Sequence, residues 1–161
     1  MIILGIDPGL AIVGWGIVEY KASRFRTVAY GSVQTPAGMK TEERLKQIYE
    51  GVRALIEKYH PDAMAIEELF FYHNQTTAIP VAEARGVVLL AARQHGIAIA
   101  EYTPMQVKQA VVGYGLAEKK QVIAMVTSLL SLPAPPKPDD TADALAIAVC
   151  HAHTGGLAKW K

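Results

Sequence analysis

Hydrophobic residues along the chain change their spacing at clear boundaries, and these changes predict where strands give way to helices. Residues 1–6 are apolar apart from one glycine and run directly into Asp7, a pattern typical of a strand covered on both faces at the centre of a sheet. Residues 11–20 and 25–35 are rich in Val, Ile, Tyr and Phe and are separated by a short polar segment. Their hairpin spacing predicts that the first three strands are antiparallel neighbours.

A helical period begins next and then alternates with two further buried strands. Apolar residues recur at helical spacing over residues 41–59, with Thr41 as the expected N-cap. Residues 63–68 predict a strand that ends in carboxylates, and a right-handed crossover would place it parallel to the first strand. A helix over residues 77–94 leads to a short last strand over residues 97–101. The predicted fold is α/β, a mixed five-stranded sheet of three antiparallel and then two parallel strands flanked by helices.

Three helices are predicted in the last third of the chain, over residues 105–112, 117–130 and 144–153. The last of them follows Asp139, Asp140 and Asp143. Acidic residues at a helix start usually cap the helix and complement its dipole, and Asp139 is expected to do this. Capping does not need three aspartates, however. Asp140 and Asp143 share one helix face at i, i+3 spacing, which favours a second role for them.

Four carboxylates, from two strand ends and one helix start, are expected to meet at one edge of the sheet: Asp7, Glu67, Asp140 and Asp143. Asp7 could instead bond its own backbone in an Asp-Pro-Gly turn. Successive strand side chains face opposite ways, so only one member of the Glu67-Glu68 pair can point into a shared site. The Asp139-Asp140 pair leaves the same ambiguity of one residue.

Carboxylates held this close together repel one another and stay ionised only beside divalent cations. A site with oxygen ligands alone favours Mg²⁺ or Mn²⁺ over zinc. Two such ions would clamp the attacking water and the leaving oxygen of a phosphodiester. The predicted reaction is therefore metal-dependent phosphodiester hydrolysis, with two ions in each site.

Composition agrees with a protein of this kind. A chain of 161 residues matches one domain over residues 1–161, and its 51% hydrophobic content excludes disorder as the main state. The net charge of +1 leaves a basic surface once the four clustered acids are set aside, as suits a protein that binds a polyanion. Cys150 is the single cysteine, and no apolar run could span a membrane, so we expect a cytoplasmic protein without disulfide or structural zinc.

Aromatic and basic residues near the acids are candidates for nucleic-acid binding. Phe70 and Phe71 lie in a loop that leaves the acidic edge, where they could stack on bases, although burial is the usual fate of such residues. Cations gather around a glycine-containing turn between two of the predicted helices, where they could contact phosphates or only be solvated. These candidates are Arg85, Lys108, Lys119 and Lys120.

The helix over residues 77–94 is apolar around almost its whole circumference. A small domain can bury only one face of such a helix against its own sheet. The other face is therefore expected to meet a second subunit in a two-fold homodimer.

The order of elements, with carboxylates at these places, resembles the ribonuclease H-like superfamily. Several stretches are similar, in family order and over nearly the whole chain, to the RuvC Holliday-junction resolvases. These stretches are Gly5-Ile6-Asp7-Pro8-Gly9, Ala65-Ile66-Glu67, Glu83-Ala84-Arg85-Gly86, Gln106-Val107-Lys108-Gln109, Val111-Val112-Gly113, Ala117-Glu118-Lys119 and Ala142-Asp143-Ala144-Leu145-Ala146-Ile147-Ala148.

This resemblance implies a homodimeric endonuclease of recombination and DNA repair that nicks two opposed strands of a four-way DNA junction and leaves 5′-phosphate ends. It implies that Asp7, Glu67, Asp140 and Asp143 are metal ligands. Lys108 and Lys119 match lysines important for cleavage, and Phe70 matches an aromatic that stacks on bases at the junction centre. The family acts with a branch-migration complex of the RuvA and RuvB type.

Two alternatives remain open from the sequence. A Gly-Ile-Asp-x-Gly hairpin also begins the phosphate loop of actin-like phosphotransferases, but these need two such lobes and this chain has the length of one. A junction-binding module without catalysis is the second alternative, and the four intact carboxylates argue against it. ATP affinity would support the first alternative, and junction binding without cleavage in Mn²⁺ would support the second.

Overall fold

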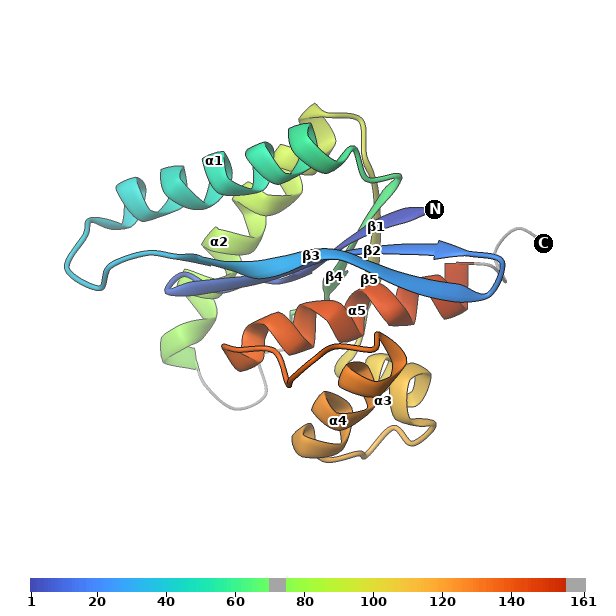
Figure 1. Ribbon diagram of the computed structural model, residues 1–161. Helices are drawn as coiled ribbons and strands as arrows, with labels where there is room; N and C mark the ends of the chain where they lie inside the picture. The colour runs from blue at the N-terminus through green and yellow to red at the C-terminus, as the bar shows by residue number, and fades with distance from the viewer. Residues whose placement is uncertain (70–74, 156–161) are drawn as a thin grey trace.

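The predicted mixed sheet is present, with its first strand at the centre (Figure 1). The computed structural model describes residues 1–69 and 75–155. Five strands in these ranges form one sheet in the order β3-β2-β1-β4-β5. They are β1 (Ile2–Asp7), β2 (Ile12–Lys21), β3 (Arg24–Gln34), β4 (Ala63–Glu67) and β5 (Ala98–Tyr102). β1 pairs antiparallel with β2, and β2 pairs antiparallel with β3. β4 lies parallel to both β1 and β5, which confirms the predicted topology.

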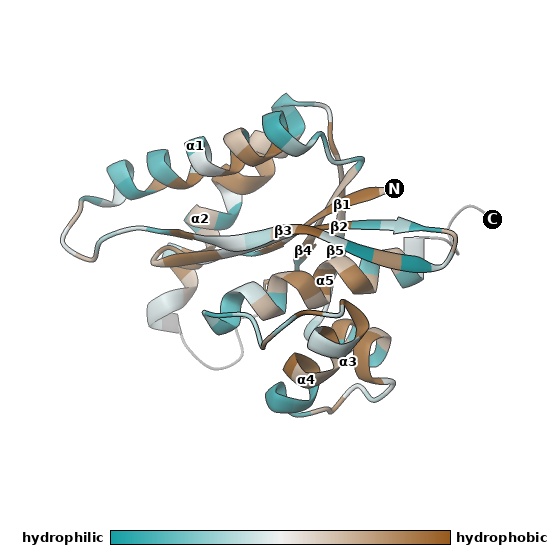
Figure 2. Ribbon diagram, viewed as in Figure 1, coloured by the Kyte–Doolittle hydropathy of each residue, from teal (hydrophilic) through white to brown (hydrophobic). Residues whose placement is uncertain are grey.

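Helices cover both faces of this sheet (Figure 1). One face carries α1 (Thr41–Tyr59) and α2 (Gln75–Gln94). The other carries α5 (Asp139–Gly155), with α3 (Pro104–Val112) and α4 (Lys119–Leu129) packed against it. The hydrophobic residues of the helices turn toward the sheet (Figure 2), so each face has its own apolar core.

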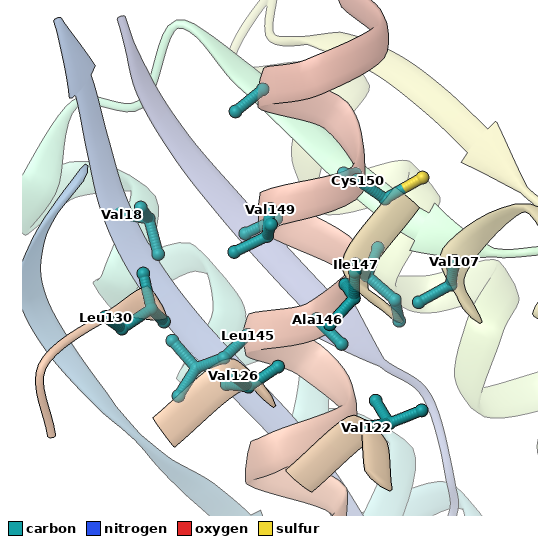
Figure 3. Close-up of a cluster of buried hydrophobic side chains, with 14 of the residues drawn as sticks. Val18, Val107, Val122, Val126, Leu130, Leu145, Ala146, Ile147, Val149 and Cys150 are labelled. Atoms are coloured by element: carbon teal, nitrogen blue, oxygen red, sulfur yellow. The ribbon is translucent and has the colours of Figure 1, made fainter. Parts of the chain in front are cut away.

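The core beneath α5 joins the sheet to the two short helices. Leu145, Ile147 and Val149 of α5 lie among side chains of β2, α3 and α4 (Figure 3). Burial on every side explains why α5 is apolar around its circumference beyond its acidic start. A helix held this firmly gives its first turn a fixed position over the sheet.

Two glycines allow α5 to approach the strands closely. A Cβ atom at Gly5 would overlap the carbonyl oxygen of Ala144, and one at Gly14 would overlap the carbonyl oxygen of Asp140. Each clash is with backbone, which cannot move aside as a flexible side chain can. The absent side chains therefore place the acidic start of α5 directly against β1 and β2.

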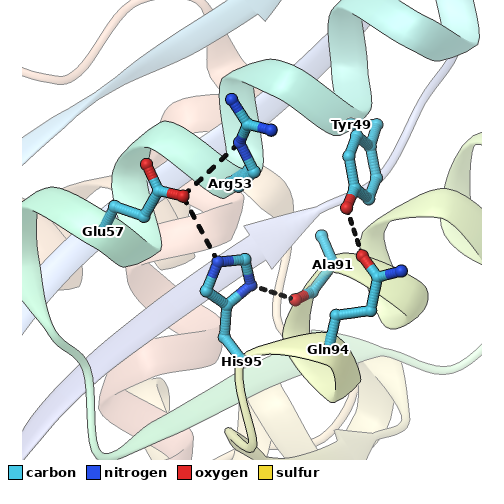
Figure 4. A network of polar contacts seen from close by, with 6 residues as sticks. All are labelled: Tyr49, Arg53, Glu57, Ala91, Gln94 and His95. Atoms are coloured by element: carbon cyan, nitrogen blue, oxygen red, sulfur yellow. Dashed lines mark hydrogen bonds and ion pairs between the residues drawn. The ribbon is translucent and has the colours of Figure 1, made fainter.

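Polar contacts on the opposite face hold α2 to α1 (Figure 4). Nε2 of His95 lies 3.4 Å from a carboxylate oxygen of Glu57, which also accepts from Arg53 at 3.5 Å. Tyr49 donates a hydrogen bond to the side chain of Gln94. These contacts fix one side of α2, so its other side faces away from α1.

Several helix boundaries differ from the sequence-based prediction. The N-cap of α1 is Lys40 and makes no side-chain cap bond, so the prediction of Thr41 was wrong. α2 begins at Gln75, ahead of the predicted Thr77, with Pro80 inside the helix. α5 begins at Asp139, so the predicted start at residue 144 was also wrong. The backbone of Asp140 packs against Gly14, and this contact favours a helical conformation ahead of the residues whose apolar spacing predicted the helix.

Candidate active site

Asp7 and Glu67 stand side by side at one edge of the sheet. β1 and β4 are parallel and pair Ile6 with Ile66, so the next residue of each strand lies at the same edge. Ala65 belongs to the core beneath α5, and alternation along the strand turns Glu67 toward the same face. Glu68 follows with the opposite orientation, which places Glu67, of the two, in the shared site.

The first turns of α5 bring two more carboxylates to this edge. Asp143 lines a pocket of about 200 Å³ together with Glu67, Lys108 and Lys119. Asp140 lines a separate groove. All four predicted acids therefore gather where β1, β4 and α5 meet, since the charges of Asp143, Glu67 and Asp140 all act on Asp7.

Burial and mutual repulsion perturb these carboxyl groups strongly. Burial, and then the neighbouring charges of Asp143, Glu67 and Asp140, raise the pKa of Asp7 to about 8. Burial and the charge of Asp143 raise the pKa of Glu67 to about 7. At neutral pH this edge therefore holds protons that ordinary carboxyl groups would have released.

Lys119 supplies the positive charge that contacts Asp143, while Lys108 and Lys119 both lower the pKa of Glu67 against the larger effects of burial and Asp143. The Nζ of Lys119 lies 3.2 Å from a carboxylate oxygen of Asp143 and 3.9 Å from one of Asp139. Burial disfavours the charged ammonium, but the acids around it outweigh burial and raise the pKa of Lys119. Burial also raises the pKa of Asp143, and the contact with Lys119 opposes that rise. One ammonium thus compensates only part of the acidic charge.

The donor set fits a hard divalent cation, although it is not arranged as a finished metal site. Within residues 1–69 and 75–155, no three acidic, histidine or cysteine side chains converge closely enough to hold a metal ion as they stand. Yet all four candidate ligands offer carboxylate oxygens, the ligands that Mg²⁺ and Mn²⁺ prefer. Burial and then the neighbouring carboxylates raise the pKa values of Asp7 and Glu67, and the positive charge of a bound cation would oppose both effects by favouring the ionised acids.

Arg85 lies on α2, and not at the glycine-containing turn where the sequence analysis grouped it with the lysines. Its side chain is 15% exposed, its Nε donates to the backbone oxygen of Glu67 at 3.3 Å, and its guanidinium forms an ion pair with Glu101. These contacts brace the ends of β4 and β5. Sequence reasoning missed this bracing role, since Arg85 and Glu101 are 16 positions apart on different elements.

The other predicted DNA-binding residues differ in how the structure places them. Lys108 lines the pocket beside Glu67. Lys120 is exposed and lies 3.2 Å from Glu118, a neighbour at the start of α4. Phe70 and Phe71 fall outside the described residues. DNA contacts by all of these residues, and by Arg85 and Lys119, therefore stay predictions.

Known proteins match this chain over nearly its whole length. The family described as crossover junction endodeoxyribonuclease RuvC matches residues 3–151. A relative of that name from Alkaliphilus metalliredigens is 61% identical over 155 residues, which cover 96% of this chain and 94% of the relative. Another relative of that name, from Clostridioides difficile, is 58% identical over 159 residues, which cover 99% of this chain and 94% of the relative.

Solved structures agree with the sequence matches. Thermus thermophilus RuvC in complex with a Holliday junction substrate superposes with a TM-score of 0.92 at 39% identity, covering 98% of this chain and 96% of that one. The yeast mitochondrial Holliday junction resolvase, at 14% identity and a TM-score of 0.68, shares the fold. The resemblance predicted from the sequence is confirmed: this chain belongs to the RuvC family of crossover junction endodeoxyribonucleases.

Proposed function

We propose that this protein resolves four-way DNA junctions by metal-dependent hydrolysis of phosphodiester bonds, leaving 5′-phosphate and 3′-hydroxyl ends, in recombination and DNA repair. The observation that carries the proposal is the convergence of Asp7, Glu67 and Asp143 beside two lysines, in a chain of the RuvC family. Relatives bear the name of an endonuclease acting on crossover junctions, and one of them has been seen with such a junction.

Asp7, Glu67, Asp140 and Asp143 would hold Mg²⁺ or Mn²⁺, with two ions in each site. Bound there, such ions supply Lewis acidity and lower the pKa of a coordinated water, the chemistry that in-line displacement at phosphorus requires. The chain's own part is to fix the carboxylate positions. The parallel pairing of β1 with β4 and the close contact of α5 with Gly14 do so through rigid elements.

Lys108 and Lys119 would orient the phosphate and offset its charge. Both line the pocket that Glu67 and Asp143 share, so a phosphodiester placed at the acids would lie within their reach. Lys119 contacts Asp143 directly, and in the complex its ammonium would be shared between carboxylate and phosphate. Lys120, Arg85, Phe70 and Phe71 are proposed to contact DNA farther from the cleaved bond.

The substrate geometry calls for two such sites, and α2 offers a surface for pairing. Ile79 and Leu90 are 68% and 50% exposed, large fractions for apolar side chains. With Glu83 and Gly86 they form a stripe at i, i+4, i+7 and i+11, and a Cβ at Gly86 would meet open space. A stripe with glycine at its middle allows a second helix to approach closely, so we propose a homodimer through α2.

Replacing Leu90 with Glu is expected to weaken this dimer by at least about tenfold, because the new carboxylate would be buried between two copies. Light scattering should give twice the 17.4 kDa chain mass for the parent and a smaller mass for the variant at micromolar concentration. Leu116→Glu is the matched control, since Leu116 is 68% exposed and lies outside α2. A parent that stays monomeric would contradict the proposal.

Two further assignments follow from family resemblance and stay proposals. One is action together with a branch-migration complex of the RuvA and RuvB type, and the other is a cytoplasmic location. Among the helices of residues 1–69 and 75–155, none is both long enough and apolar enough to cross a bilayer.

The function is tested by incubating the protein with an end-labelled four-way junction and with linear duplex of the same sequence, each with Mg²⁺, Mn²⁺ or a chelator. We expect paired nicks in the junction only when a divalent ion is present, and nicked products that a ligase can seal. Equal cutting of linear duplex would refute junction selectivity. Cutting that continues in chelator would refute the metal mechanism.

A further inference from the structure

A groove of about 450 Å³ opens beside Asp140, and neither Lys108 nor Lys119 lines it. It lies where the β1–β2 turn meets the first turns of α1 and α2, segments that come together at one end of the sheet (Figure 1). Its lining comprises residues 9–12, Arg44, Thr76, Thr77, Pro80, Val81 and Asp140. Apart from the proposed metal role of Asp140, none of the roles assigned above uses this groove.

The lining combines apolar surface with one permanent positive charge. Leu10, Ile12, Pro80 and Val81 contribute carbon-rich walls. Arg44 contributes a guanidinium, which always stays charged and favours phosphate as a partner. A flat apolar group that carries a phosphate would satisfy both parts of such a lining, and a nucleotide is a group of this kind.

Arg44 is held in a way that leaves its charge available. Its Nε donates to the hydroxyl of Thr35 at 2.8 Å, and that hydroxyl donates in turn to the backbone oxygen of Leu10 at 2.6 Å. Both acceptors are neutral. Among the described residues no carboxylate lies within ion-pair distance of Arg44, whereas Arg26, Arg53 and Arg85 each have one.

The position of Arg44 in its helix also favours an external anion as its partner. It lies in the first turn of α1, where the helix dipole favours the acids Glu42 and Glu43 and disfavours a cation. Fixing a charge there by a bond to Thr35 adds no favourable charge pairing within the protein. An external anion would supply the missing partner.

The groove is continuous with the candidate active site through Asp140. That carboxylate lines the groove and is close enough to Asp7 to raise its pKa. Lys108 and Lys119 line the separate pocket that contains Glu67 and Asp143. A DNA strand whose scissile phosphate lay at the acids would therefore have two depressions within reach, each with a cation in its lining.

We propose that this groove binds the nucleotide next to the cleaved bond, with its sugar or base against Pro80 and Val81 and its phosphate at Arg44. The inference rests on the proposed function, because it assumes that the acids receive a DNA phosphate. It adds a second anchoring point on the side of the site that has no lysine in its lining.

The first test compares Arg44→Gln with Arg53→Gln, a matched loss of one charge from a more distant part of the same helix. Binding of a four-way junction is measured in Ca²⁺ over a series of salt concentrations. For Arg44→Gln we expect affinity to fall about tenfold and the slope of log K against log salt to shrink by about 0.9, one phosphate contact. Arg53→Gln should leave the slope within error of the parent.

A phosphate contact carries no sequence information, so the Arg44→Gln loss should be the same for junctions with different central sequences. A loss confined to one sequence would overturn the phosphate assignment. If Arg44→Gln matches Arg53→Gln in affinity and slope while the parent binds and cuts junctions, the groove proposal fails and the proposed function stands. A parent that neither binds nor cuts junctions would defeat both.

A second variant separates binding from folding, because losing the Arg44–Thr35 bond could itself disturb α1. Thr76→Glu places a carboxylate at the mouth of the groove, in the first turn of α2, where the helix dipole favours it. We expect an unchanged or higher thermal midpoint together with weaker junction binding. Ala54→Glu, an exposed site on α1, adds the same charge away from the groove. Equal binding by these two variants would overturn the proposal.

Discussion

Replacing Asp7 with Asn is expected to lower the rate of junction cleavage by about 1,000-fold in Mg²⁺, with junction binding retained. Asn keeps the size of the side chain and an acceptor oxygen but removes the negative charge. Asp7 is the acid that Asp143, Glu67 and Asp140 all influence, so it lies at the centre of the proposed metal site.

Single-turnover cleavage of a labelled junction, with binding measured separately, tests this expectation. Asp62→Asn is a matched control, since Asp62 accepts from the backbone of Ile2 at 2.7 Å and an amide oxygen can do the same. The control should cut at the parental rate. An Asp7→Asn protein that cuts as fast as its parent would show that the acids do not act through metal.

Without divalent ions, the thermal midpoint is expected to fall as pH rises from about 5 to about 8. In the folded protein the pKa of Asp7 is about 8 and that of Glu67 about 7, against 3.8 and 4.5 for unperturbed groups. Between these values the folded state holds protons that the unfolded state has released, so raising the pH favours unfolding. Below about pH 4 both states are protonated and the effect disappears.

The expected loss is ~2 kcal/mol, or roughly 5 °C, after allowance for solvent screening at a partly open site. Mg²⁺ should restore the midpoint, and by more at about pH 8 than at about pH 5, because it binds the ionised acids. Calorimetry in chelator and in Mg²⁺ measures both effects. The thermal midpoint of Asp7→Asn should change less with pH, and rise less on addition of Mg²⁺, than that of the parent. A parental midpoint that rises over this range in chelator would contradict the pKa assignments.

The sheet and the meeting of the four acids could be predicted from the sequence, and for Asp7 and Glu67 the prediction follows from local rules. An apolar run that ends in Asp7, and a second that ends in Glu67 after a helix, imply parallel neighbours whose ends meet. The start of α5 was harder to place. An aspartate at a helix start has the same pattern whether it caps the helix or faces a metal, and the predicted boundary fell five residues late.

What sequence reasoning missed depends on contacts between distant elements. Arg85 was a candidate for DNA binding, and its bonds to the Glu67 backbone and to Glu101 follow only from the packing of α2 against β4 and β5. Arg44 had a weak local signal, a cation in the first turn of a helix. That signal gains meaning only once the groove beside Asp140 is known.

The close contact of α5 with Gly5 and Gly14 also affects how loss-of-function alleles should be interpreted. At these two positions even a methyl group would collide with the backbone that carries Asp140 and Ala144. A genetic screen for inactive alleles would therefore recover both glycines alongside the acids, although neither takes part in chemistry. Loss of function alone would not distinguish the glycine substitutions from substitutions of the acids. The amount of protein that accumulates in the cell would distinguish them.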